Sequence, residues 1–283
     1  MNYFLLLSSI FILQSCAQNY GLLHLETTLP KTLNEVSGIA TNEHLIWMIN
    51  DGNNPSVVYQ YNISEKRIES SHKIENAQNK DWEDLTLDDD GNLYIGDFGN
   101  NKNKRKDLVI YKTNISDFKK TEKITFKLED QLKFPPKKKH LNFDIEAFFF
   151  YKSNLYLFSR NRSSDFDGTT TLYKLPATPG DYLARKIGAF KTCKDPSDCQ
   201  ITSADFHASS KTIALLSYNK VWLLSNFTED RFFEGSIKEI KLKHSSQKEA
   251  ITFKDQNTLY ITDERSGPIG RNLYTLDISK IKE

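Results

Sequence analysis

The chain has 283 residues, and its 38 Lys and Arg against 37 Asp and Glu give a formal net charge of +1. This balance offers no general attraction to nucleic acid or to an anionic membrane surface, so it argues against a nucleic-acid-binding protein. A hydrophobic content of 38% is enough for a buried core, and after the N-terminus no run approaches the roughly 20 apolar residues of a membrane-spanning helix.

The first 20 residues resemble an export signal followed by a short tether. Residues 3–13 form an apolar run too short to span a bilayer, and Leu-Gln-Ser-Cys follows at 13–16. This tetrapeptide is similar to the bacterial lipobox, although no Lys or Arg precedes the run. The resemblance implies a lipoprotein signal peptide at 1–15, lipidation of Cys16 and a lipidated tether at 16–20. The alternative is a plain secretory peptide that is removed with its cysteine.

The residues after Cys16 indicate the membrane in which a lipid anchor would lie. Position 17 is Ala and not the Asp of an inner-membrane retention signal, and no acidic tether follows. We therefore expect a lipid anchor in the outer membrane, with the chain on the periplasmic side in preference to the cell surface.

From residue 21 onward, five segments share one layout. Each has a short apolar strand, a tight polar turn, a second strand with a polar end, a variable loop and an aromatic third strand. An alternating fourth strand follows four of them, at 67–74, 122–129, 182–190 and 236–242. The fifth lacks it, and residues 21–29 are the natural replacement.

Four-stranded sheets repeated in this way are typical of a β-propeller. The sequence therefore predicts an all-β fold of five blades, closed by the N-terminal strand, with residues 21–283 as one domain. The longer stretches 113–143 and 176–200 leave room for a degenerate copy, so a six-bladed propeller is the alternative.

Two cysteines remain, Cys193 and Cys199, in a polar loop with Pro196. In an oxidising compartment we expect them to form a disulfide. A zinc site is the competing interpretation, but it needs four ligands and no histidine lies nearby.

The first strand of every propeller blade lines the central channel, so equivalent residues of the five segments form a ring. The register brings together five side chains that offer only oxygen, and they are Ser37, Glu83, Glu146, Ser203 and Glu249. Three carboxylates in a confined channel need protonation, inserted basic residues or a cation. Calcium prefers such hard oxygen ligands, so the ring predicts a Ca²⁺ site. The alternative is that each Glu accepts backbone N–H groups in a water-filled channel.

Serine, glutamate, glutamate, serine and glutamate around a propeller axis resemble the calcium-activated nucleotidases, or apyrases, in order and approximate spacing. The resemblance implies an axial calcium and, less directly, nucleotidase activity. In that family an acidic pair followed by Arg comes after a second strand, whereas residues 50–53 here read Asn-Asp-Gly-Asn. Asp51 matches one acid, and the arginine is absent.

The loops between second and third strands are expected on the same face as the ring. They are rich in Arg, Asn and Asp, a composition suited to a small anionic or polar ligand. We expect the ligand-binding residues there, namely Asn53, Asn100, Arg105, Arg160, Arg162, Glu264 and Arg265. Candidate catalytic bases are Asp51 and Asp97.

These patterns predict an exported, monomeric, calcium-binding propeller that binds a small anionic or polar ligand. One alternative is a calcium-dependent phosphohydrolase that uses the same face. Another is a scaffold for a protein partner, which would need an exposed apolar patch on that face.

Overall fold

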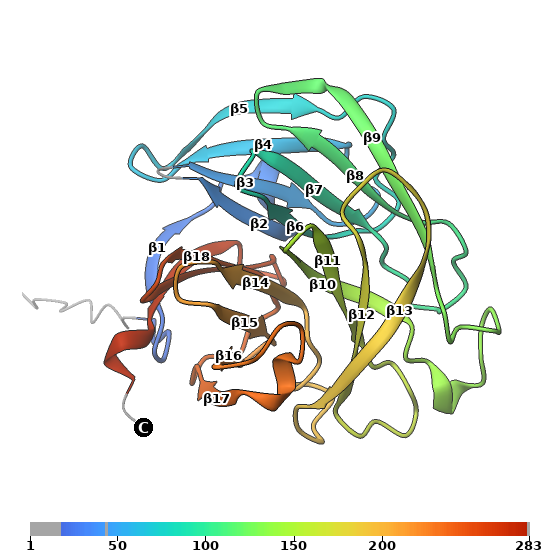
Figure 1. Cartoon of the computed structure of the whole chain (residues 1–283). Coiled ribbons are helices and arrows are strands. Elements are labelled where there is room, and N and C mark those ends of the chain that lie inside the picture. Colours follow the sequence, from blue (N-terminus) through green and yellow to red (C-terminus); the bar gives the residue numbers. More distant parts are fainter. Residues whose placement is uncertain (1–17, 43–44, 282–283) are drawn as a thin grey trace, which may run out of the picture.

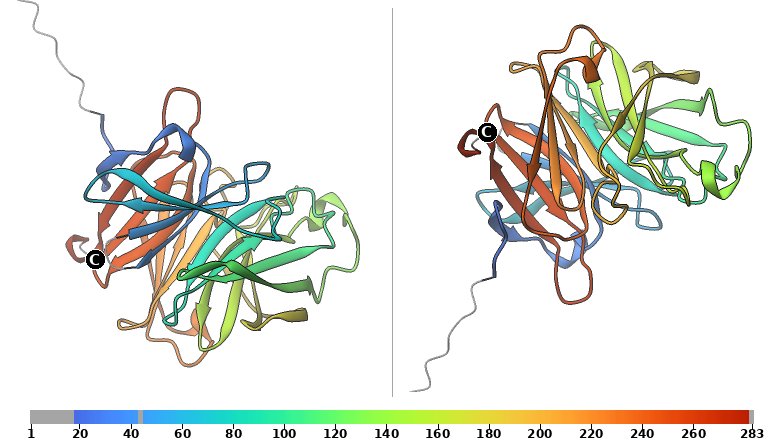
Figure 2. Two further views of the ribbon diagram at one scale, coloured as in Figure 1. Left: turned by 90° about the horizontal axis from the view of Figure 1, so that it is seen from above. Right: turned by 90° about the horizontal axis from the view of Figure 1, so that it is seen from below.

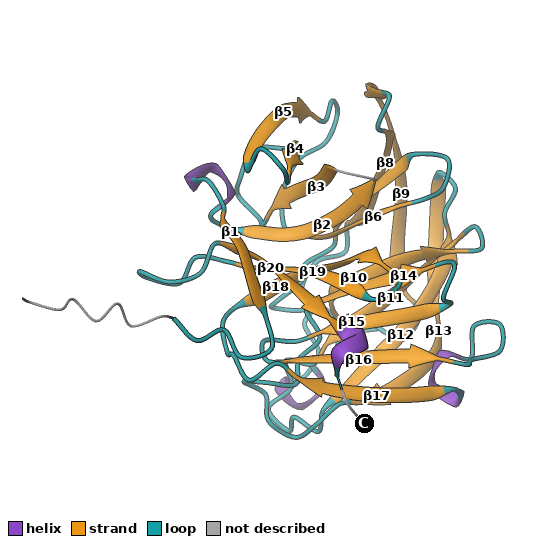
Figure 3. Cartoon of the chain, turned by 90° about the vertical axis from the view of Figure 1, so that its left-hand side faces the viewer, coloured by secondary structure: helices purple, strands orange, loops and turns teal. Residues whose placement is uncertain are grey.

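The computed structural model describes residues 18–42 and 45–281. The expected signal peptide at 1–15 and the lipidation site Cys16 lie outside the described residues. Figure 1 shows strands arranged as sheets around a central axis. The described helical segments, purple in Figure 3, are 3₁₀ helices of 3 residues each. No helix within the described ranges combines the length and the apolar character needed to cross a membrane.

Five four-stranded units make up the fold. The strands nearest the axis are β2 (Val36–Asn42), β6 (Trp82–Leu87), β10 (Asp144–Tyr151), β14 (Ser203–His207) and β18 (Lys248–Asp255). The second strands are β3 (Leu45–Asn50), β7 (Asn92–Asp97), β11 (Asn154–Arg160), β15 (Thr212–Leu216) and β19 (Thr258–Asp263). The third strands are β4 (Val57–Asn62), β8 (Leu108–Asn114), β12 (Thr169–Pro176), β16 (Lys220–Ser225) and β20 (Asn272–Asp277).

The outer strands complete the five units and close the ring. They are β5 (Arg67–Lys73), β9 (Asp117–Leu128), β13 (Gly180–Lys191), β17 (Ser236–Lys241) and, for the last unit, β1 (His24–Thr28). Strand β1 pairs antiparallel with β20, which places the blue N-terminal strand beside the red C-terminal ones in Figure 2. The inner strands neighbour one another in the cyclic order β2, β6, β10, β14, β18. The predicted five-bladed propeller, closed by its N-terminal strand, is confirmed.

The two long stretches that left room for a sixth blade hold unusually long outer strands instead. Strands β9 and β13 have 12 residues each, and residues 124–128 of β9 pair in parallel with residues 180–184 of β13. Blades 2 and 3 thereby merge into one eight-stranded sheet.

The hydrophobic core lies between neighbouring blades. Five clusters of buried side chains each join residues of two adjacent blades. Phe149 of β10, for example, packs edge-on against Phe232 of the next blade, with ring centroids 5.5 Å apart. Each such buried aromatic side chain contributes on the order of 2–3 kcal/mol to stability. The blades are thus held together by face-to-face packing of apolar sheets.

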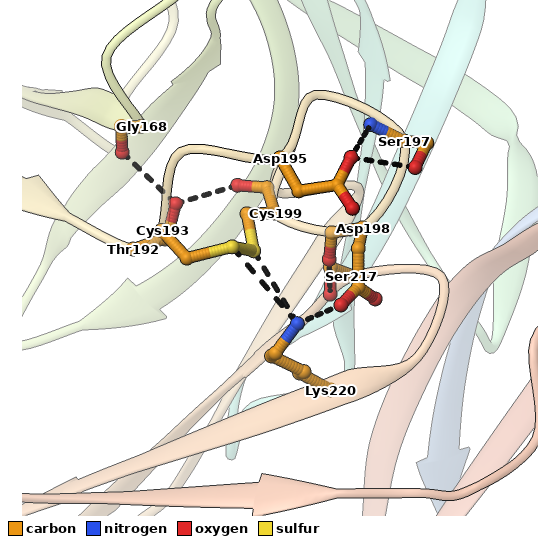
Figure 4. Close-up of a disulfide and its surroundings, with 9 residues drawn as sticks. All are labelled: Gly168, Thr192, Cys193, Asp195, Ser197, Asp198, Cys199, Ser217 and Lys220. Atoms are coloured by element: carbon orange, nitrogen blue, oxygen red, sulfur yellow. Dashed lines mark hydrogen bonds and ion pairs between the residues drawn. A yellow bond between two sulfur atoms is a disulfide. The ribbon is translucent and has the colours of Figure 1, made fainter.

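The expected disulfide between Cys193 and Cys199 is present, with the two Cα atoms 5.4 Å apart. Figure 4 shows the ammonium group of Lys220 facing it, paired with Asp198 and 3.4 Å from the sulfur of Cys199. A lysine ammonium in this position competes with any metal ion that these sulfurs could bind. The geometry therefore favours the disulfide over the zinc interpretation.

The double substitution Cys193→Ala/Cys199→Ala is expected to lower the free energy of unfolding by about 2 kcal/mol, since the disulfide closes a short loop. Gln200 follows directly and accepts a hydrogen bond from Nε of Arg160 at 3.0 Å, so the loop also supports the centre of the molecule. Urea unfolding of the two proteins measures the difference. An unchanged midpoint would show that the loop is held without the bond.

Candidate functional site

A small cavity of about 180 Å³ opens at one end of the axis. Its walls come from the starts of the inner strands and from the segments that follow the second strands, which the sequence placed on one face. The residues that line it are Ser37, Asp51, Glu83, Asn101, Glu146, Arg160, Arg162, Tyr218, Gln247, Glu249 and Glu264. Five of these side chains are carboxylic acids and two are guanidinium groups, so acidic groups are in excess.

β-Bulges direct four of the five predicted ring residues. The antiparallel register of the first two strands skips one residue in each of four blades, and the skipped residues are Ser37, Glu83, Glu146 and Glu249. A bulge inserts an unpaired residue and re-aims its side chain, and bulges are common beside functional sites. The repeated bulge explains why these four side chains meet in the cavity.

The fifth ring residue, Ser203, does not line the cavity. Its hydroxyl donates to Asp84 at 3.1 Å and accepts from the backbone N–H of Ile251 at 3.1 Å. Asp84 is fully buried and also accepts from the N–H groups of Phe148 and Ala204. Ser203 therefore takes part in a polar junction between blades and not in the cavity.

On one side of the cavity, two arginines pair with the carboxylates. Nη1 of Arg160 lies 3.0 Å from Glu146 and 3.9 Å from Glu249, and its Nη2 donates to the hydroxyl of Tyr218. Arg162 contacts Glu146 at 2.7 Å through Nη2. Tyr218 in turn donates to Glu249 at 3.0 Å. Inserted basic residues, one of the three remedies for crowded carboxylates, thus neutralise Glu146.

On the other side of the cavity, the carboxylates of Asp51 and Glu83 have no basic partner among the described residues, and Asp81 lies next to them although it is not part of the cavity lining. Oxygens of Asp51, Asp81 and Glu83 lie within 4.8 Å of one another. Asp51 accepts a hydrogen bond from the N–H of its neighbour Gly52, whereas the carboxylates of Asp81 and Glu83 accept none from any described residue. Unpaired carboxylates at such short separations repel one another strongly.

The pKa values of Asp51, Asp81, Glu83 and Glu146 follow this division, whereas burial raises the pKa of Glu249 to about 7 despite its contacts with Arg160 and Tyr218. Burial raises the pKa of Asp51 to about 7 and that of Asp81 to about 6, and the neighbouring carboxylates add to the rise at Asp51. Burial, together with Glu146 and Asp51, raises the pKa of Glu83 well above its usual range. Burial would also raise the pKa of Glu146, but Arg160 and Arg162 hold it below its usual range.

Metal-free protein should lose stability as the pH rises. A carboxyl group whose pKa is higher in the folded than in the unfolded chain binds its proton more tightly when folded, so its contribution is present below about pH 4 and is lost as the pH passes the folded value. For Asp51 and Asp81 that window ends near pH 6 to 7. We expect the Tm in chelator to fall by about 5 °C between about pH 5 and about pH 8. A Tm that rises over this range would contradict the repulsion inferred here.

One predicted catalytic base, Asp97, and several of the predicted ligand-binding residues lie outside the cavity. Asp97 is fully buried and paired with Arg105 at 3.0 Å, and Nη2 of that arginine donates to the carbonyl oxygen of Asp97. Asn100 is buried and caps the same loop by accepting from the N–H of Arg105. Asn53 is exposed, and Arg265 lines a separate depression beside the 267–271 segment. Asp51, Arg160, Arg162 and Glu264 do line the cavity.

Asp81 was missed by the sequence analysis, although a signal was present. It stands two residues before Glu83, and the equivalent positions of the other segments are Glu35, Asp144, Ile201 and Gln247. Four of the five are acids or amides, so a second set of polar residues stands at or just before the starts of the inner strands. Gln247 lines the cavity and donates to Glu264 at 2.5 Å.

No protein-family model matches the chain, and no curated protein matches its sequence. Among solved structures, the PQQ-bound aldose sugar dehydrogenase from Streptomyces coelicolor is similar with a TM-score of 0.50 and 8% identity, over 90% of this chain and 97% of that one. The fold is that of a β-propeller. A gluconolactonase from Xanthomonas campestris has a TM-score of 0.46 and 11% identity, over 86% of this chain and 71% of that one. At such identities the likeness concerns the fold alone.

Proposed function

We propose that this protein is an exported, lipid-anchored propeller that binds calcium in its axial cavity and, beside the ion, a small anionic or polar ligand. Export and the anchor rest on the apolar run at 3–13, the lipobox-like sequence ending at Cys16, and the disulfide. The place of action would be the periplasmic side of the outer membrane.

The observation that carries the calcium proposal is the surplus of buried acid. Five carboxylates line the cavity against two guanidinium groups, and both guanidinium groups are engaged by Glu146. Each of these carboxylates offers hard oxygen ligands of the kind that Ca²⁺ prefers. A divalent cation would relieve the repulsion and allow the high-pKa carboxyl groups to ionise.

Among the described guanidinium groups that line the cavity, one nitrogen atom is free to bind an anionic ligand. Arg162 uses Nε and Nη2 for Asp144 and Glu146, whereas its Nη1 makes no hydrogen bond to any described residue. A guanidinium nitrogen at the cavity wall can bind a carboxylate or phosphate oxygen. With a volume of about 180 Å³, the cavity suits an ion and a small polar group better than a large apolar ligand.

A hydrolase is the second candidate, and Asp51 favours it. This residue lines the cavity with a pKa raised to about 7, the range in which a carboxylate serves as a general base at neutral pH. Calcium would then polarise a phosphoryl oxygen of a nucleotide or another phosphate ester. The nucleotidase resemblance of the ring residues points to the same chemistry.

Melting curves with calcium, and then with calcium plus inorganic phosphate, sugar phosphates and nucleotides, test both candidates. Calcium at about 100 times its Kd should add about 2.7 kcal/mol of stability, or about 5 °C in Tm. A further shift with an anion, seen only when calcium is present, supports the binding protein, and release of phosphate supports the hydrolase. No response to calcium would refute the proposal.

A further inference from the structure

We propose that the calcium ion sits off the propeller axis, held by Asp51, Asp81 and Glu83. The guanidinium of Arg160 then occupies the axial position where the sequence predicted the ion. This inference rests on the proposed function and specifies its metal site. It assigns the ion to two blades, since Asp51 follows β3, whereas Asp81 directly precedes β6 and Glu83 lies near the start of that strand.

The state of Glu83 is the observation that points to a ligand. Its side chain lines the cavity, the residue is only 9% exposed, and its carboxylate has neither a hydrogen bond nor an ion pair with any described residue. Burial of a polar group without a partner is costly, and native structures rarely tolerate it. A cation that contacts this carboxylate would remove the cost.

The backbone around the cluster leaves room for these carboxylates. A Cβ atom placed on Gly99 would come within 2.6 Å of Oδ2 of Asp81 and closer still to Oε1 of Glu83, and one on Gly52 would lie 2.8 Å from Oδ1 of Asp81. The glycines therefore let the backbone approach the carboxylates closely from two segments, one that follows β3 and one that follows β7. The loops of blades 1 and 2 form a cradle that a larger residue at either position would fill.

The other four predicted axial ligands are, by contrast, already engaged. Glu146 receives two guanidinium groups, Glu249 receives Tyr218 and lies 3.9 Å from Arg160, and Ser203 is turned to Asp84. Ser37 donates its hydroxyl proton to the carbonyl oxygen of Trp82 at 2.7 Å. The guanidinium of Arg160 supplies positive charge between Glu146 and Glu249, so a second cation there would be repelled.

The test compares the calcium-induced rise in Tm of the wild-type protein with that of Asp81→Asn, Glu249→Gln and Asp89→Asn. Asp89 is an exposed residue in the turn between β6 and β7, so its substitution makes the same change of charge outside the cluster. We expect Asp81→Asn to weaken the affinity for calcium at least about tenfold and to remove most of the calcium-induced rise in Tm. Asp89→Asn should keep the wild-type shift.

A second readout separates ligation from a purely structural role. Asparagine has the shape of aspartate without its charge, so Asp81→Asn should raise the Tm in chelator by relieving repulsion from Asp51 and Glu83. A lower Tm in chelator would show that Asp81 supports the fold instead and would overturn its assignment as a ligand.

The outcomes distinguish this inference from the function on which it rests. Loss of the calcium shift in Asp81→Asn, with the shift retained in Asp89→Asn, supports the off-axis site. Loss in Glu249→Gln, either alone or together with Asp81→Asn, overturns the off-axis assignment while calcium binding stands. A wild-type protein that shows no calcium shift overturns both.

Discussion

Arg160→Met is expected to lower the free energy of unfolding in chelator by about 3–5 kcal/mol, because a buried charge loses its partner. The guanidinium is almost fully buried and contacts Glu146, Gln200 and Tyr218, all at about 3 Å. Methionine has a similar length but provides neither a positive charge nor a hydrogen-bond donor for these groups. Guanidinium chloride unfolding of both proteins measures the loss.

Calcium should restore part of this stability, because removal of the guanidinium opens the axial position between Glu146 and Glu249 to a cation. The double variant Arg160→Met/Glu146→Gln is the control, since it also removes the carboxylate that was left with reduced pairing. It should be more stable in chelator than the single variant. Equal stability of Arg160→Met and wild type would show that the arginine does not balance the ring.

Asp84→Ala is expected to cost about 3–5 kcal/mol, because it leaves buried N–H groups of two other blades without an acceptor. Oδ2 of Asp84 accepts from Phe148 of blade 3 at 3.0 Å and from Ala204 of blade 4 at 3.3 Å, while Oδ1 accepts from Leu85 and Ser203. The side chain is fully buried, so these N–H groups are not open to bulk solvent. The Tm and the denaturant midpoint should both fall.

Thr86→Val is the matched control for Asp84. Thr86 lies two residues along the same strand and accepts one long hydrogen bond from the N–H of Phe150, at 3.4 Å. Valine preserves its shape, so we expect a loss of no more than about 1 kcal/mol. If Asp84→Ala were as mild as this control, the proposed junction between blades would be wrong.

The repeat pattern predicted the fold well because blade strands are local units. Apolar first strands, aromatic third strands and turn residues recur in each segment, so the order and the approximate bounds of all five blades could be read without tertiary information. The parallel pairing of β9 with β13 could not be read in this way. It depends on how two outer strands of different blades meet, and the sequence of neither strand specifies its partner.

The site was predicted in part. The register identified Ser37, Glu83, Glu146 and Glu249, and the structure brings all four to one cavity. The register did not reveal that Arg160 and Arg162 turn inward to pair with Glu146, because the direction of a loop side chain depends on the surrounding fold. The same is true of Ser203, whose hydroxyl turns to Asp84.

Direct calcium titration of the wild-type protein tests the central claim most directly. Isothermal titration calorimetry in chelator-treated buffer near pH 7.5, at up to about 1 mM calcium, covers the affinity range of both sensor-type and weaker protein sites. We predict saturable binding of one calcium ion per chain with release of protons, because the ion displaces them from carboxyl groups of raised pKa such as Asp51. The absence of saturable binding in this range would contradict a calcium site in the cavity.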